Sequence, residues 1–128
     1  MYKSGAHTKH RLRYHIVWIP KYRKRLLTGR VAQRLKELLQ QCAESHDWVI
    51  EEQCIQVDHI HLLIQLNPSE SVSYAVHILK GGTSRVIRQE FPTIKEQLWG
   101  ASFWADGYFA ETFGQCNEEL IKAYVRNQ

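Results

Sequence analysis

The chain has 128 residues, of which 44% are hydrophobic and 23% charged, and its formal net charge is +4. This length and balance are typical of one globular domain and leave too few residues for two. No apolar run approaches the ~20 residues of a membrane span, and none of signal-peptide length follows the basic N-terminus, so we expect a cytoplasmic protein. Three widely spaced cysteines without a Cys-x-x-Cys pair favour reduced thiols.

The charge is distributed unevenly along the chain. Residues 1–36 contain eleven lysines or arginines and no acid, whereas the remaining 92 residues contain six basic and thirteen acidic side chains. Such a concentration is most often an electrostatic footprint for nucleic acid. Aromatic residues interleaved with these cations suit stacking on unpaired bases; they are Tyr2, Tyr14, Trp18 and Tyr22. The simpler alternative is a solvated basic surface with a disordered tail.

The first half of the chain predicts a strand, a helix and a hairpin after a loose arm at 1–9. Residues 11–19 are rich in β-branched and aromatic side chains and stop at Pro20, which indicates a strand. A basic connector at 21–27 leads to a helix that Thr28 would cap and that runs to about residue 46. Strands at 48–56 and 59–66 follow, joined by a two-residue turn.

The second half predicts two helices around one strand. Ser69 or Ser71 would cap a helix that runs to about residue 90. Gly81-Gly82 would interrupt this helix, either by kinking it or by letting its backbone come close to a partner. A loop is expected at 91–101 and a strand within 103–113, bent at Gly107 and ended by Gly114. Asn117 would cap the last helix, to about residue 127. The β-α-β-β-α-β-α order predicts an α+β fold: a ferredoxin-like or RNA-recognition-like antiparallel sheet with helices on one face.

The strand at 59–66 carries the most specific pattern. Ile60, Leu62, Ile64 and Leu66 alternate with His59, His61, Leu63 and Gln65, so one face is fully apolar and the other holds two neighbouring imidazoles. Such a pair, held on a well-anchored strand, can chelate a metal. The alternative is a half-exposed strand whose histidines merely bond to their neighbours.

The last helix places Leu120, Tyr124 and Gln128 on one face, at i, i+4 and i+8. A phenol nucleophile and an amide ligand could therefore enter one site. The alternative is a packing tyrosine beside a frayed terminal glutamine.

Several segments together resemble one known family. They are HIVWIPKYRKRLL at 15–27, VDHIHLLIQL at 57–66, LKGGTSRVI at 79–87, FWADGYFAETFG at 103–114 and EELIKAYVRNQ at 118–128. In this order they resemble the single-tyrosine transposases of the HUH superfamily, of the IS200-like insertion-sequence kind. The resemblance covers nearly the whole chain. It departs at Gly82, where the family often has a second basic residue.

The resemblance implies a set of roles. Tyr124 would be the nucleophile, leaving a 5′-phosphotyrosine and a free 3′-hydroxyl, and His59, His61 and Gln128 would bind Mg²⁺ or Mn²⁺. The nitrogen-rich ligand set favours manganese. Glu111 and Asp58 are candidate bases, although each could be a surface carboxylate. The implied contacts to single-stranded DNA hairpins at element ends are Lys21, Tyr22, Arg23, Lys24, Arg25, Lys80, Arg85 and Arg88.

The resemblance also implies a homodimer and a single domain over 1–128 whose tyrosine helix, 117–128, is mobile, with Gly107 and Gly114 as hinges or as ordinary turn glycines. Three other interpretations remain. A domesticated relative would process palindromes by the same chemistry. A non-catalytic single-strand binding module would form no covalent adduct. A zinc hydrolase would need a further ligand and a water nucleophile.

Overall fold

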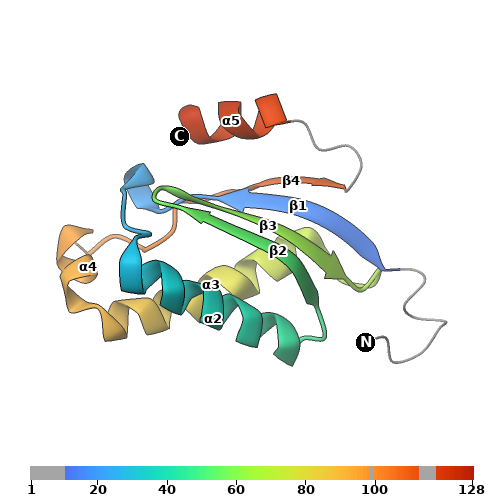
Figure 1. Cartoon of the computed structure of the whole chain (residues 1–128), viewed down its shortest axis with the longest axis horizontal. Coiled ribbons are helices and arrows are strands. Elements are labelled where there is room, and N and C mark those ends of the chain that lie inside the picture. The colour runs from blue at the N-terminus through green and yellow to red at the C-terminus, as the bar shows by residue number, and fades with distance from the viewer. Residues whose placement is uncertain (1–10, 99, 113–117) are drawn as a thin grey trace.

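The computed structural model describes residues 11–98, 100–112 and 118–128, with the side chains of 118–120 excepted. One four-stranded antiparallel sheet forms its centre, in the order β2-β3-β1-β4 (Figure 1). The strands are β1 Leu12–Trp18, β2 Val49–Gln56, β3 His59–Leu66 and β4 Phe109–Thr112. The helices are η1 Lys21–Arg23, α2 Gly29–Ser45, α3 Val72–Glu90, α4 Pro92–Gln97 and α5 Glu118–Arg126.

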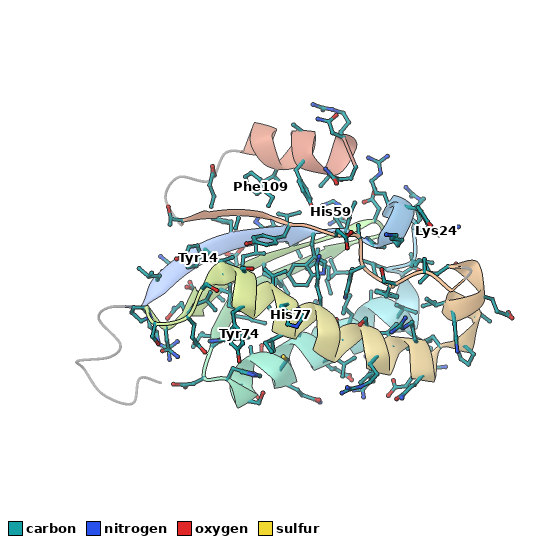
Figure 2. The ribbon with its side chains drawn as sticks, turned by 180° about the vertical axis from the view of Figure 1, so that it is seen from behind. Tyr14, Lys24, His59, Tyr74, His77 and Phe109 are labelled. Carbon is teal, nitrogen blue, oxygen red and sulfur yellow. The ribbon has the colours of Figure 1, made fainter. Side chains whose placement is uncertain are left out.

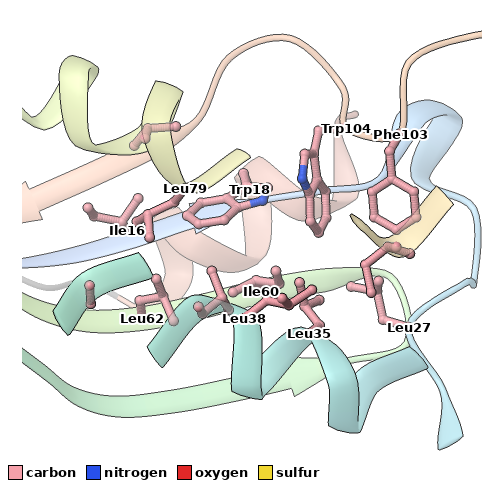
Figure 3. Packing of buried hydrophobic residues seen from close by; sticks show 14 of the residues in the cluster. Ile16, Trp18, Leu27, Leu35, Leu38, Ile60, Leu62, Leu79, Phe103 and Trp104 are labelled. Carbon is pink, nitrogen blue, oxygen red and sulfur yellow. The ribbon is translucent and has the colours of Figure 1, made fainter. Parts of the chain in front are cut away.

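The core lies between one face of the sheet and the two long helices. The four apolar residues that alternate along β3 are completely buried, as the sequence pattern predicts. Figure 3 shows Ile60 and Leu62 of β3 packed with Trp18 of β1 and against Leu35 of α2 and Leu79 of α3. Because every second residue of β3 is held in this core, the histidines between them must project from the other face.

Helix α3 begins where Ser71 accepts a hydrogen bond from the Tyr74 N–H at 3.0 Å, so Ser71 rather than Ser69 is the cap. The helix continues without a break through Gly81-Gly82, and the predicted interruption is therefore wrong. A Cβ atom on Gly82 would lie 3.6 Å from Cys42 Sγ of α2, an ordinary contact. Neither a kink nor an unusually close approach requires glycine there.

The segment predicted to be a loop at 91–101 contains the short helix α4. It begins with Pro92, which suits the first turn of a helix because no intrahelical N–H is lost there. Ile94 and Leu98 are buried against the core, which keeps this six-residue helix in place. After it, Phe103 and Trp104 enter the core, and the strand itself is only four residues long.

Helix α5 lies on the opposite face of the sheet from α2 and α3 (Figure 1). The α+β antiparallel architecture is confirmed, with α2 and α3 on one face as expected, while α5 adds a third layer over the histidine face. The predicted Gly114 terminus and Asn117 cap lie outside the described residues. Within the described ranges, no helix combines the length and the apolar character needed to cross a membrane.

Candidate metal and tyrosine site

The strand register places the candidate residues in rows across the face of the sheet that carries the histidines. His61 of β3 is opposite Cys54 of β2 and Val17 of β1, and Val17 is opposite Phe109 of β4. Figure 2 shows Phe109 and His59 on the side that faces α5, whereas His77 and Tyr74 lie on α3, on the opposite side of the sheet. The histidine pair therefore lies under the layer that carries the tyrosine.

His59 is oriented by the residue before it. Its Nδ1 atom is 2.9 Å from Asp58 Oδ1, with 23% of the His59 side chain exposed. An ionised carboxylate can only accept, so Nδ1 carries the hydrogen and donates it. The other ring nitrogen, Nε2, then keeps its lone pair in the neutral imidazole and is able to bind a cation.

His61 has a partner that the sequence analysis did not single out. Its Nε2 atom is 2.9 Å from Nδ1 of His15, and the two ring centroids are 5.1 Å apart. The period of two in β1 was the available signal, because it places His15 on the face opposite the buried Ile16 and Trp18. Three imidazoles therefore lie on this face, two of them in direct contact.

The donor set fits a divalent cation only in part. In the part of the chain that the structure describes, no three His, Cys, Asp or Glu side chains converge as a metal site would need. A cation on His59 and His61 would have to complete its coordination with oxygen atoms of another kind, such as an amide, water or phosphate. Gln128 is exposed and is the second residue after the end of α5, where its N–H faces the Val125 carbonyl at 3.5 Å.

Tyr124 lies on α5 with its ring against the sheet. Its centroid is 6.1 Å from that of Phe109, and its hydroxyl oxygen is buried with no hydrogen-bond partner among the described residues. Burial raises the pKa of Tyr124 above the usual phenol value. The docked phenol therefore stays protonated, and its hydroxyl is buried where no described residue forms a hydrogen bond with it.

One arginine joins the histidine strand to the tyrosine helix. Arg23 Nη1 donates to the Val125 carbonyl at 2.8 Å, and Arg23 Nε lies 3.6 Å from Asp58 Oδ2. Beside this contact is a pocket of about 300 Å³, lined by Arg23, His59, Ile121, Lys122, Val125 and Arg126. The tertiary structure thus brings together β3, η1 and α5.

The predicted DNA contacts in the basic connector surround η1. Tyr22 is 68% exposed, and the Lys21 Nζ atom lies 5.8 Å from its ring centroid. Tyr22 and Arg23 both have positive φ, +60° and +50°, a region that non-glycine residues rarely occupy. Lys24 and Arg25 continue the same surface segment. Trp18, in contrast, is completely buried and is not available for stacking on a base.

The predicted contacts on α3 divide into two kinds. Lys80 Nζ donates to the carbonyls of Ala105 and Gly107 at 2.8 and 2.7 Å, so it holds the loop before β4. Burial lowers the pKa of Lys80, and the charge of Asp106 opposes that effect. The other two cations, Arg85 and Arg88, form no ion pair with any described residue.

The candidate bases occupy different positions. Asp58 is engaged with His59 and Arg23, as described above. Glu111 is opposite His15 in the β1–β4 register, on the histidine face. Glu111 and Asp58 both stay candidates, and the two carboxylate oxygens of Asp58 are engaged with His59 and Arg23.

Comparison with known proteins identifies the family. The model described as "Transposase IS200 like" matches residues 8–128. The ISDra2 transposase TnpA of Deinococcus radiodurans is 32% identical over 126 residues, which cover 98% of this chain and 90% of that protein. The IS200 transposase of Salmonella typhimurium is 34% identical over 127 residues, covering 98% of this chain and 82% of that protein.

Solved structures agree with this fold. A crystal structure of a Deinococcus radiodurans protein assigned as a transposase matches with a TM-score of 0.88 at 30% identity, over 100% of this chain and 98% of that one. A REP-associated tyrosine transposase bound to a REP hairpin shares the fold, with a TM-score of 0.57 at 13% identity over 89% and 62% of the two chains. The chain belongs to the IS200-like transposase family.

Proposed function

We propose that this transposase cleaves and rejoins single-stranded DNA at insertion-sequence ends, with Tyr124 as the nucleophile and a divalent cation held by His59 and His61. The observation that carries the proposal is the buried Tyr124 hydroxyl without a described partner, on a helix that Arg23 ties to the histidine strand. Most buried polar groups have a hydrogen-bond partner, so a buried hydroxyl without one calls for an explanation. A phosphate or a ligand at this site would give the hydroxyl its missing partner.

The proposed reaction is an in-line phosphoryl transfer. The Tyr124 oxygen attacks phosphorus, the bond from phosphorus to the 3′ oxygen breaks, and the phenolic proton ends on that 3′ oxygen. A bound Mg²⁺ or Mn²⁺ would supply Lewis-acid stabilisation of the charge on the phosphate oxygens. The phosphotyrosine retains the bond energy, so that attack by another 3′-hydroxyl reverses the step and rejoins a strand without ATP.

Our proposal includes a movement of α5 during the reaction. Phe109, on which Tyr124 packs, is separated from His61 by β1, which corresponds to about 10 Å at two strand spacings. We therefore keep a mobile tyrosine helix over 117–128, with Gln128 as the further cation ligand, as part of the proposal. A homodimer, in which each helix serves the partner's histidines, would meet the same requirement.

The proposed DNA surface extends from η1 to α3. The Lys21 N–H donates to the Phe103 carbonyl at 2.8 Å, so η1 lies beside the loop that Lys80 holds. On the α3 side, a cavity of about 220 Å³ is lined by groups that include Ser84, Arg88 and Ser102. Cations on both sides of one loop can follow a bent strand, and the exposed Tyr22 ring can stack on an extruded base.

The direct test is formation of a covalent adduct. The protein is incubated with single-stranded DNA from the flanks of its own gene and Mg²⁺ or Mn²⁺, and denaturing gels are examined for an SDS-resistant complex. We expect a metal-dependent adduct with the natural chain and none with Tyr124→Phe. Tyr74→Phe is the matched control, because Tyr74 lies on α3 and is 44% exposed. An adduct that persists in Tyr124→Phe would place the nucleophile elsewhere.

The metal and the DNA preference need separate controls. His61→Ala should lower adduct formation because Mn²⁺ binding is weakened, so that added Mn²⁺ no longer stimulates the reaction. His46→Ala should respond to Mn²⁺ as the natural chain does, because His46 stacks on Trp48 away from the site. Equal cleavage of duplex and single strand would contradict the single-strand assignment. Tight hairpin binding with no adduct under any metal would favour the non-catalytic binding module instead.

A further inference from the structure

The contacts around Asp58 form a continuous chain from the histidine strand to the end of the tyrosine helix. Asp58 uses its two carboxylate oxygens for different partners, Oδ1 for His59 at 2.9 Å and Oδ2 for Arg23 at 3.6 Å. Arg23 in turn donates to the Val125 carbonyl at 2.8 Å. The Asp58 side chain is only 18% exposed, so bulk water competes weakly for these bonds.

We propose that Asp58 and Arg23 are positioning residues that couple the cation-binding form of His59 to the docking of the tyrosine helix. The inference rests on the proposed function, and it assigns a role to two residues that do not themselves touch the reacting atoms. Asp58 holds the His59 ring with hydrogen on Nδ1, and Arg23 holds Asp58 and α5 together.

The geometry at Asp58 selects one tautomer of His59. A neutral imidazole has one hydrogen, and a carboxylate acceptor at Nδ1 draws that hydrogen to Nδ1. Nε2 is then the lone-pair nitrogen and is directed away from Asp58. Carboxylates in this position around metal-binding histidines orient the ring and make the ligand more basic, and their loss typically weakens metal binding by about 10- to 100-fold.

The geometry at Arg23 stabilises the C-terminal end of α5. The last carbonyls of a helix have no intrahelical partner and carry partial negative charge. A guanidinium is positively charged and only donates hydrogen bonds, so it is well suited to pair with them. Val125 is the residue before the last one of α5. Arg23 reaches it from a turn in which Tyr22 and Arg23 both adopt positive φ. Strained backbone of this kind persists only where surrounding contacts enforce it.

A shared arginine makes the two events interdependent. When α5 leaves the sheet, Arg23 loses one of its partners and holds Asp58 less firmly. When His59 is held by a cation, the ring fixes Asp58, and Asp58 fixes Arg23 under the helix. Docking of α5 and binding of a cation should therefore strengthen one another, because both events favour the same position of the Arg23 side chain.

The first test measures the metal-free protein without DNA. Long-range ¹H–¹⁵N correlation spectra report which nitrogen of His59 carries the hydrogen, and we expect Nδ1. Isothermal titration with MnCl₂ should show affinity about 10- to 100-fold weaker in Asp58→Ala. Asp58→Asn keeps the shape and one acceptor oxygen, so it should restore the tautomer and part of the affinity. Glu90→Ala is the matched control, since Glu90 pairs with Arg34 on the helical layer.

The second test measures the helix. Amide hydrogen exchange of residues 121–128 should be about tenfold faster in Arg23→Gln, since one charge-assisted hydrogen bond is lost, and unchanged in Arg34→Gln. Added MnCl₂ should slow exchange in the natural chain and not in Arg23→Gln.

Three results would overturn the inference. They are hydrogen on Nε2 of His59 in the natural chain, Mn²⁺ affinity of Asp58→Ala within twofold of the natural value, and unchanged α5 exchange in Arg23→Gln. The first needs no variant, so the inference stays testable if a substitution prevents folding. Failure to form a DNA adduct would refute the proposed function alone, because none of these measurements contains DNA.

Discussion

Removing the Tyr124 hydroxyl should make the tyrosine helix dock more tightly while it abolishes the proposed chemistry. The Tyr124 side chain packs on Phe109, but its hydroxyl oxygen is buried with no partner among the described residues. Tyr124→Phe retains the ring contact and removes only the oxygen. The variant therefore separates the cost of the hydroxyl from the packing of the ring.

The size of the effect follows from the cost of burying a hydroxyl. Protein mutational data place the burial of an unpaired polar group of this kind at about 1–3 kcal/mol. Because the Tyr124 side chain is only partly buried, we expect the lower end, about 1 kcal/mol in favour of Tyr124→Phe. Since every 1.4 kcal/mol is a factor of ten, the open population of α5 should fall about fivefold.

The effect of pH has the same origin. Burial raises the pKa of Tyr124 in the folded state, so docking has its full stability below the ordinary phenol pKa of about 10 and loses it as the pH rises through the raised value. Phenylalanine does not titrate. The advantage of Tyr124→Phe over the natural chain should therefore grow in alkaline solution.

Amide hydrogen exchange of residues 121–128 is the appropriate assay, because α5 can open without global unfolding. We expect slower exchange in Tyr124→Phe and no change in the control Tyr74→Phe. Faster exchange in Tyr124→Phe would mean that the hydroxyl has a favourable partner in solution. The argument that its burial is unsatisfied would then be wrong.

Three further predictions concern other parts of the molecule. Thr83→Val removes the acceptor for the Trp104 indole N–H, now 3.1 Å away and buried, and should lower the free energy of unfolding in urea by about 1–3 kcal/mol. Tyr22→Ala should weaken single-stranded DNA binding by about 5- to 150-fold in fluorescence anisotropy, with an unchanged urea midpoint. Arg13 holds the pKa of Glu51 below its usual range, so this pair stabilises the fold above the ordinary Glu pKa, and the contribution is lost as the pH falls through the lowered value. In Glu51→Gln, the melting temperature should depend less steeply on pH in the acid range than it does in the natural chain. The same slope in both proteins would contradict the pairing of Arg13 with Glu51.

Local patterns in the sequence were sufficient for most of the secondary structure. The predicted strand at 59–66 has the observed bounds of β3, and the predicted end of the second helix at residue 90 coincides with the end of α3. Both elements carry long apolar periodicities that only one kind of backbone can bury. Helix α4 was missed because six residues are too few to display a helical period, and its stability comes from burying Ile94.

The sequence by itself determined which face of β3 is buried and that two imidazoles share the other face, because side chains of a strand alternate and a core admits only the apolar set. It also identified the family. Only the tertiary structure decided that His15 contacts His61, 46 residues away, and that Arg23 bonds to Val125, 102 residues away. These contacts depend on the register between strands and on the face to which α5 docks, which side-chain packing over long separations decides and no local pattern encodes.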